Sequence, residues 1–198
     1  MIFFDYDGVL VDSLNLCINS CKFAADELDY SGEFPQNPYA NLNPVTYHEV
    51  ARRLGLDEIK FENLATKYLN ENINTIKLFD GTTEILETLS KNYTLCVLSS
   101  TKKETIKQSL DNKGILEYFS EIYGGGEISK EARLKEKAPE KSIMIGDSIS
   151  DMRAAKNAGI YAIGALWGWQ DANMLKEANV LVKNHNELLK AINSYFSI

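Results

Sequence analysis

Carboxylates stand directly after two apolar runs of the sequence, where their charges lie close together. The run MIFF leads to Asp5, Asp7 follows after one residue, and a third acid, Asp12, lies nearby. Further along the chain, the run SIMIG leads to Asp147, and Asp151 follows four residues later. Carboxylates that converge on one place repel each other unless a cation lies between them. The residue types therefore predict a cation site built from oxygen ligands.

Hydroxyl groups and a lysine follow two other apolar runs. Ser99 and Ser100 end the stretch TLCVLSS, and Lys130 follows the stretch EIYGGG. An all-oxygen acidic cluster suits a hard ion, most simply Mg²⁺, which also binds the oxygens of substrate phosphates. In phosphoryl chemistry a carboxylate can be the nucleophile, a second acid can move protons, and serine and lysine can bind phosphoryl oxygens. Mg²⁺-assisted phosphoryl chemistry is thus the reaction class that these residues predict.

The apolar runs predict the strands that would position these residues. Continuous apolar runs of this kind are typical of strands buried in a parallel sheet. They occupy residues 1–4, 94–100, 121–126, 142–148, 160–166 and 179–184, and helical patterns over 81–92, 102–115 and 151–160 alternate with them. This alternation predicts a doubly wound, Rossmann-like parallel α/β sheet. Ligands of such sheets bind beyond the carboxyl ends of the strands, so we expect the acids, hydroxyls and lysine to meet at one rim.

One section of the chain lacks convincing strands. Between residues 14 and 80 the patterns are helical, over 14–30, 45–56 and 58–77, with a proline-containing loop after the first of them. The chain has 198 residues, which suits one full domain with an inserted module. We therefore predict an α/β core formed by residues 1–13 and 81–198, with an all-helical cap at 14–80.

Composition narrows the class of partner. The net charge is -7, and no cluster of lysine and arginine suggests binding to a nucleic-acid backbone. A small anionic substrate remains compatible, because a metal ion and a lysine can reverse the local field. No apolar stretch approaches the ~20 residues that a membrane span requires, and no signal peptide is recognisable. We expect a cytoplasmic protein with no membrane partner, whereas the sequence indicates no oligomeric state.

Three motifs resemble those of a known enzyme superfamily. FFDYDGVLVDS resembles the first motif of the haloacid dehalogenase-like (HAD) hydrolases, D-x-D-G-(T/V)-L-x-D-S. LCVLSS is similar to the second motif, and IGDSISDMRAAKNAGI is similar to the fourth. The stretch 78–100 resembles the segment that leads from a helical cap back to the core, and the stretch 164–189 resembles the tail of phosphoglycolate phosphatase-like members. The match extends over nearly the whole chain and keeps the motifs in order.

The resemblance implies a role for each motif residue. Asp5 would be the nucleophile and would form an aspartyl-phosphate, while Asp7 would protonate the leaving oxygen and then activate water. Mg²⁺ would be bound by the carboxylates of Asp5 and Asp147 and by the backbone carbonyl of Asp7. Ser99 would bind a phosphoryl oxygen, with Ser100 competing for that role. Asp151 would be a further metal-shell or orienting carboxylate.

The third motif departs from the family pattern. The segment GGGEISKEARLKEKAPEKSIMIGD is shorter than the usual one and lacks its Lys-Pro-x-Pro form. Lys130 best fits the role of the lysine that binds phosphoryl oxygens. Ser129 can cap a helix and would place Lys130 in its first turn. Lys135 and Lys137 are the alternatives.

The resemblance implies a Mg²⁺-dependent phosphatase that hydrolyses a small phosphorylated metabolite, with phosphoglycolate as the leading substrate. Rival activities within the superfamily are a sugar-phosphate mutase, a pyrophosphatase, a nucleotidase and a phosphonatase. The phosphonatase would need a cap lysine, for which Lys22 is the early-cap candidate. A non-catalytic binding protein on the same fold is an alternative of another class, and the intact set of acids argues against it.

Overall fold

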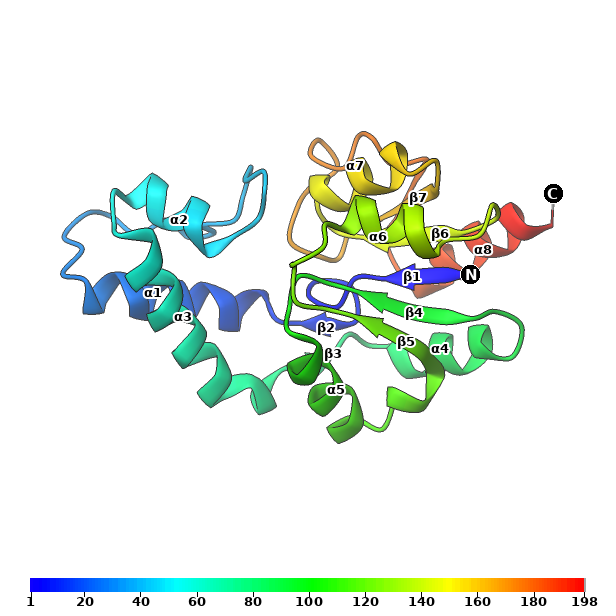
Figure 1. Ribbon diagram of the computed structural model, residues 1–198, viewed down its shortest axis with the longest axis horizontal. Helices are drawn as coiled ribbons and strands as arrows, with labels where there is room; N and C mark the ends of the chain where they lie inside the picture. The colour runs from blue at the N-terminus through cyan, green and yellow to red at the C-terminus, as the bar shows by residue number, and fades with distance from the viewer. Residues whose placement is uncertain (198) are drawn as a thin grey trace. The chain divides into compact units, whose positions relative to one another are not determined.

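The computed structural model describes residues 1–197 and divides into two compact units (Figure 1). The sheet unit comprises Met1–Asp12 and Leu78–Ile198, and the helical unit comprises Ser13–Lys77. These boundaries fall close to those expected at residues 14 and 81. A cap function for the helical unit stays a prediction.

A six-stranded parallel sheet forms the centre of the sheet unit, with the strand order β5–β4–β1–β6–β7–β8. Its strands are β1 (Ile2–Phe4), β4 (Leu95–Leu98), β5 (Phe119–Tyr123), β6 (Ile143–Gly146), β7 (Tyr161–Ala165) and β8 (Val180–Val182). Strand β1 lies between β4 and β6, and Phe4 is in register with Val97 on one side and Ile145 on the other. The predicted doubly wound α/β fold is therefore confirmed.

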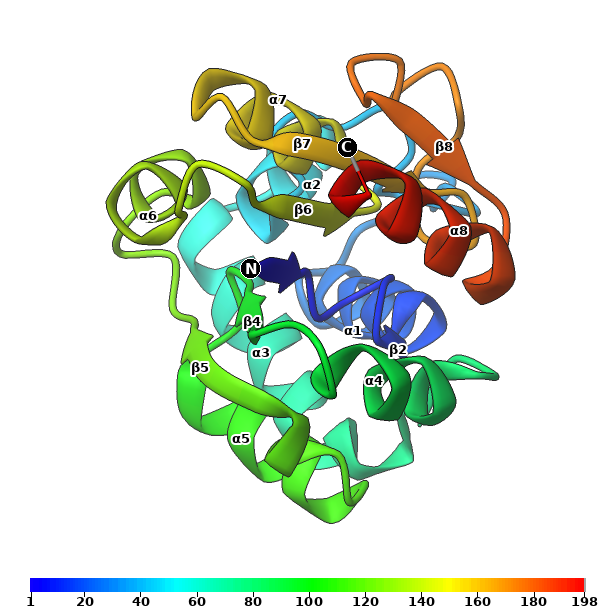
Figure 2. The same ribbon diagram turned by 90° about the vertical axis from the view of Figure 1, so that its right-hand side faces the viewer.

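Helices cover both faces of this sheet. They are α4 (Thr82–Ser90), α5 (Lys103–Asn112), α6 (Lys130–Lys137), α7 (Ile149–Asn157) and α8 (His185–Phe196), with a 3₁₀ turn, η2, at Leu116–Tyr118. Figure 2 shows α6 and α7 on one face and α4 and α8 on the opposite face. Because both faces are covered, the strands read as continuous apolar runs, and Phe3, Cys96 and Met144 are fully buried between the layers.

The helical unit contains α1 (Leu14–Glu27), α2 (Tyr47–Leu54), α3 (Glu58–Asn72) and a 3₁₀ turn, η1, at Ile73–Thr75. Helix α3 packs against both α1 and α2. Cys17 and Cys21 lie one turn apart on the buried face of α1, and neither forms a disulfide. The Cys21 thiol contacts the buried Tyr39 hydroxyl at 3.0 Å. These two cysteines therefore serve the packing of the unit.

One short pair of strands was not predicted, and the bounds of another strand were wrong. The range 14–80 was expected to contain no strand, yet β3 (Lys77–Leu78) pairs with β2 (Val11–Asp12) in a two-stranded sheet. Strands this short carry no periodicity that a sequence could reveal. The expected strand at 121–126 instead begins at Phe119 and ends at Tyr123, because the chain turns at the glycines, where Gly125 has a φ of 103°.

Within residues 1–197, every helix is too short or too polar to cross a membrane.

Candidate active site

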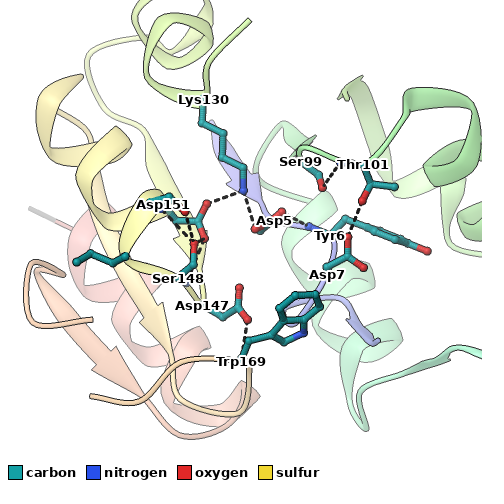
Figure 3. A network of polar contacts seen from close by, with 12 residues as sticks. Asp5, Tyr6, Asp7, Ser99, Thr101, Lys130, Asp147, Ser148, Asp151 and Trp169 are labelled. Carbon is teal, nitrogen blue, oxygen red and sulfur yellow. Dashed lines mark hydrogen bonds and ion pairs between the residues drawn. The ribbon is translucent and has the colours of Figure 1, made fainter. Parts of the chain in front are cut away.

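Three neighbouring strands of the sheet end in polar residues at the same rim (Figure 3). Asp5 follows β1, Ser99 follows β4 and Asp147 follows β6. The backbone N–H of Asp5 donates to the Ile145 carbonyl at 2.9 Å, which continues the pairing of β1 with β6 to the base of the site. The register of three parallel strands thus brings together residues that are far apart in the sequence.

The residue between the two N-terminal acids points away from them. Tyr6 is fully buried, and its hydroxyl contacts Ser109 of α5 at 2.5 Å. Tyr6 therefore anchors the segment in the core and leaves Asp5 and Asp7 at the rim.

Three buried carboxylates gather at this rim. Asp5, Asp147 and Asp151 each offer an oxygen, and these oxygens lie within 4.8 Å of one another. Burial raises the pKa of Asp5 to about 7, with the charges of Asp151 and Asp7 adding to the shift and Lys130 opposing it. Burial, followed by the charges of Asp5 and Asp151, likewise raises the pKa of Asp147 well above its usual range. The site therefore carries more negative charge than its surroundings compensate.

Lys130 lies between two of these carboxylates. Its ammonium donates to Asp5 Oδ2 at 2.6 Å and to Asp151 Oδ1 at 2.6 Å. Burial lowers the pKa of Lys130, but the two carboxylates more than offset this effect, so its pKa lies above the ordinary value. The ammonium is consequently positively charged across the physiological range.

Helix α6 positions this lysine. The helix begins at Lys130, and the Ser129 side chain accepts a hydrogen bond from the Ala132 N–H at 3.2 Å, which confirms the predicted cap and first-turn position. The alternative lysines do not reach the carboxylates of the site: Lys135 pairs with Glu131 at 2.6 Å, and Lys137 pairs with Glu136 at 2.8 Å.

Helix α7 holds Asp151 through a capping box. The Ser148 hydroxyl donates to Asp151 Oδ2 at 2.6 Å, and the Ser148 N–H donates to the same oxygen at 3.2 Å. One carboxylate oxygen therefore serves the helix N-terminus, while the other binds Lys130. This arrangement fits an orienting carboxylate, which is one of the two roles that the resemblance implied for Asp151.

Asp147 is enclosed by two loops of the sheet unit. The backbone N–H of Trp169 donates to Asp147 Oδ2 at 2.6 Å. On another side lies Gly8, which has a φ of 73°, and a Cβ added there would lie 1.9 Å from Asp147 Oδ2. Only glycine combines this backbone conformation with this close approach. The glycine of the D-x-D-G motif thus makes room for a carboxylate from the opposite end of the sequence.

Asp7 and Ser99 are connected through Thr101, which the sequence did not reveal. The Thr101 hydroxyl donates to Asp7 Oδ2 at 2.6 Å, and the Thr101 N–H donates to Ser99 Oγ at 3.1 Å. Ser99 is buried, whereas Ser100 is exposed. Both serines line a cavity of about 100 Å³ that Lys130 and the loop 124–129 also line. Hydroxyls and an ammonium therefore line this cavity.

The donor set fits a divalent cation. Among the described residues, three carboxylates lie close together and the Lys130 ammonium pairs with two of them, Asp5 and Asp151. Buried carboxylates with raised pKa values are stabilised by a cation. The ligand atoms are all oxygens, which Mg²⁺ prefers. Asp5, Asp147 and Asp151 could each supply a carboxylate oxygen to such an ion, and the resemblance names the carboxylates of Asp5 and Asp147 as the ligands.

The sequence did not identify Ser148, Thr101 and Trp169 as residues of the site, and only Ser148 lies in a recognisable sequence pattern. Ser148 could have been found, because Ser-x-x-Asp before a helix is a capping-box pattern. The contact of Thr101 with Asp7 spans 94 positions, and that of Trp169 with Asp147 spans 22. Neither contact leaves a local pattern.

Comparison with known proteins agrees with this geometry. A family model described as haloacid dehalogenase-like hydrolase matches residues 2–165. A phosphoglycolate phosphatase from Synechococcus elongatus is 28% identical, with 96% of each chain covered. A pyrophosphatase from Oceanobacillus iheyensis is 22% identical over 99% of this chain and 98% of its own. The solved structure of a haloacid dehalogenase-like family hydrolase from Streptococcus pneumoniae superposes with a TM-score of 0.82 at 25% identity, covering 96% of each chain. This chain belongs to the haloacid dehalogenase-like hydrolase family.

Proposed function

We propose that this protein is a Mg²⁺-dependent phosphatase that hydrolyses a small phosphate monoester through a phosphorylated Asp5. The observation that carries the proposal is the rim itself, where the carboxylates of buried Asp5, Asp147 and Asp151 lie close together and the Lys130 ammonium pairs with Asp5 and Asp151. Asp7 and Ser99 lie at the same rim, connected through Thr101. Family membership supports the hydrolase class, and phosphoglycolate phosphatases among the relatives support a phosphate ester as substrate.

The first step would transfer the phosphoryl group to Asp5. A carboxylate oxygen of Asp5 forms a bond to phosphorus as the bond from phosphorus to the ester oxygen breaks. Asp7, in its protonated form, gives its proton to that oxygen, so the leaving group departs as an alcohol. Lys130 and the Ser99 hydroxyl would donate to the phosphoryl oxygens as charge redistributes.

The second step would release phosphate. Asp7, now a carboxylate, takes a proton from a water molecule as the water oxygen bonds to phosphorus. The bond between phosphorus and Asp5 then breaks, which returns the Asp5 carboxylate and yields inorganic phosphate. Mg²⁺ held by Asp5, Asp147 and the Asp7 carbonyl would supply positive charge for the phosphoryl oxygens.

The substrate proposed first is phosphoglycolate, because several curated relatives carry that name, at 24–29% identity. A pyrophosphatase among the relatives makes inorganic pyrophosphate the second candidate. Both compounds present a terminal phosphoryl group to the same acids. A panel of phosphorylated metabolites, assayed with the purified protein, would rank them, and a preferred substrate outside small monoesters would overturn the first choice.

The class of reaction can be tested with p-nitrophenyl phosphate. We expect turnover with Mg²⁺ and none after the metal is removed with a chelator. Asp5→Asn should lower kcat by at least about 10³-fold because the nucleophile is lost. Asp12→Asn is the matched control, since Asp12 belongs to the same acidic segment but is exposed in β2. Absence of turnover with every divalent metal tested would contradict the proposal, as would normal turnover by Asp5→Asn.

A further inference from the structure

Thr101 connects Asp7 of the first motif with Ser99 of the second motif. It lies between β4 and α5, and its side chain and backbone contact residues of different elements (Figure 3). The hydroxyl donates to Asp7 Oδ2 at 2.6 Å, and the N–H donates to Ser99 Oγ at 3.1 Å. One residue therefore touches both the proposed proton carrier and the proposed phosphoryl-binding serine.

The backbone of Thr101 is fixed on its other side as well. Its carbonyl accepts a hydrogen bond from the Gly125 N–H at 2.9 Å. Gly124 packs so closely that a Cβ added there would lie 2.6 Å from the Thr101 carbonyl oxygen. The Thr101 N–H and carbonyl are thus both engaged, and a β-branched side chain on a fixed backbone has few rotamers. The hydroxyl is held in place rather than free to rotate.

The length of the hydroxyl contact indicates its character. A distance of 2.6 Å lies at the short end of the range of O–H···O hydrogen bonds. The contact is made to Oδ2 of Asp7. The same threonine amide occupies an acceptor site of Ser99 Oγ, which leaves the serine O–H to act as a donor.

We propose that Thr101 is a positioning residue that orients Asp7 for proton transfer to the leaving oxygen; this inference rests on the proposed function. The hydrogen bond restricts the rotation of the Asp7 carboxyl group. Its loss would impair the step in which the leaving oxygen receives a proton. It would not impair the attack of Asp5 on phosphorus to the same extent.

Two kinds of ester distinguish an effect on protonation of the leaving oxygen from an effect on the attack of Asp5. p-Nitrophenolate leaves without needing a proton, whereas an aliphatic alkoxide must be protonated as it departs. The ratio kcat/KM reports the steps up to departure of the first product and excludes the later hydrolysis of phosphorylated Asp5. We therefore compare kcat/KM for p-nitrophenyl phosphate with that for phosphoglycolate, with β-glycerophosphate as a second aliphatic ester.

Thr101→Val keeps the shape of the side chain and removes the hydroxyl. We expect it to lower kcat/KM for the aliphatic esters by about ten-fold or more beyond any loss for p-nitrophenyl phosphate, since general acid catalysis contributes about 10² to 10⁴. Thr101→Ser restores the hydroxyl and should recover most of this difference. A disturbed fold would instead lower both ratios together, and denaturation curves of each variant measure that effect.

The outcomes distinguish the inference from the function on which it rests. Equal losses on both kinds of ester, or a Thr101→Ser variant as impaired on aliphatic esters as Thr101→Val, would overturn the role of Thr101 and leave the phosphatase standing. A wild-type protein that hydrolyses neither kind of ester would overturn both.

Discussion

At the scale of single residues, Lys130 balances the negative charge of the carboxylates at the rim. Lys130 donates to Asp5 and Asp151 at 2.6 Å each, and its side chain is largely buried. A buried ion pair contributes little net stability, but removal of one partner leaves a buried charge without compensation. Lys130 therefore matters for the fold as well as for the proposed binding of phosphoryl oxygens.

Lys130→Met should destabilise the metal-free protein. We expect the free energy of unfolding to fall by about 3 kcal/mol at neutral pH, because two buried carboxylates lose their cation. Urea denaturation in the presence of a chelator measures this change. Lys135→Met is the matched control, because Lys135 lies on the same helix in an exposed pair with Glu131, and its loss should change stability by less than about 0.5 kcal/mol. Similar effects of the two substitutions would contradict the account.

At the scale of elements, strand register and loop geometry position the acids. The register of β1 with β4 and β6 brings Asp5, Ser99 and Asp147 to one rim. The turn after β1 must then approach Asp147 closely, which Gly8 allows. A side chain at this turn would displace a proposed metal ligand without touching the ion.

Gly8→Ala should weaken Mg²⁺ binding. The added Cβ would lie 1.9 Å from Asp147 Oδ2, so the carboxylate must move. We expect the Kd for Mg²⁺ to rise by at least about ten-fold, the lower end of the loss seen when groups supporting a metal ligand are removed, as measured by calorimetry. Gly114→Ala provides the control, since Gly114 has a similar φ of 68° but no atom within 4 Å of the added Cβ. It shares the backbone strain of about 1 to 2 kcal/mol and should leave the Kd unchanged. An unchanged Kd for Gly8→Ala would show that Asp147 does not bind the metal from this position.

Elements with strong patterns were predictable from the sequence, and contacts between loops were not. The apolar runs predicted the six strands of the sheet, and Ser129 predicted the start of α6 at Lys130. The pairing of β2 with β3 and the true bounds of β5 were missed, because strands of two residues lack periodicity and a run of glycines can continue or end a strand. The link from Thr101 to Asp7 depends on tertiary structure alone.

At the scale of the whole molecule, the chain divides into two compact units, one built around a sheet and one built of helices. The sheet unit holds all of the acids, hydroxyls and lysine to which a role is assigned. The helical unit has a core of its own, with Phe61, Ala65 and Cys21 fully buried. A cap that governs substrate choice is the role we expect for it.

Stability should depend on pH through a histidine outside the active site. Burial lowers the pKa of His185, with the Asp80 backbone and the Glu84 charge opposing this shift. The ring lies 3.5 Å from the Thr82 hydroxyl and 4.9 Å from the Trp167 ring. Because the unfolded chain binds the proton more readily, stability should fall as the pH drops through about 6.5, the ordinary value. His185→Asn should lose less stability than the wild type between about pH 8 and about pH 5, as measured by urea denaturation. Identical pH profiles would show that protonation of His185 does not affect folding.

The central claim is that Asp5 carries the phosphoryl group. The most direct measurement uses Asp7→Asn, which lacks the base that activates water but can still react with p-nitrophenyl phosphate, because that leaving group needs no proton. The variant is mixed with this ester and Mg²⁺, quenched in acid, digested, and examined by mass spectrometry. We predict a phosphoryl group on the peptide that contains Asp5. Hydroxylamine should remove it, as expected for an acyl phosphate. The double variant Asp5→Asn/Asp7→Asn should carry no phosphoryl group on this peptide. A phosphoryl group on another residue, or release of p-nitrophenol without any phosphorylated Asp5, would contradict the account.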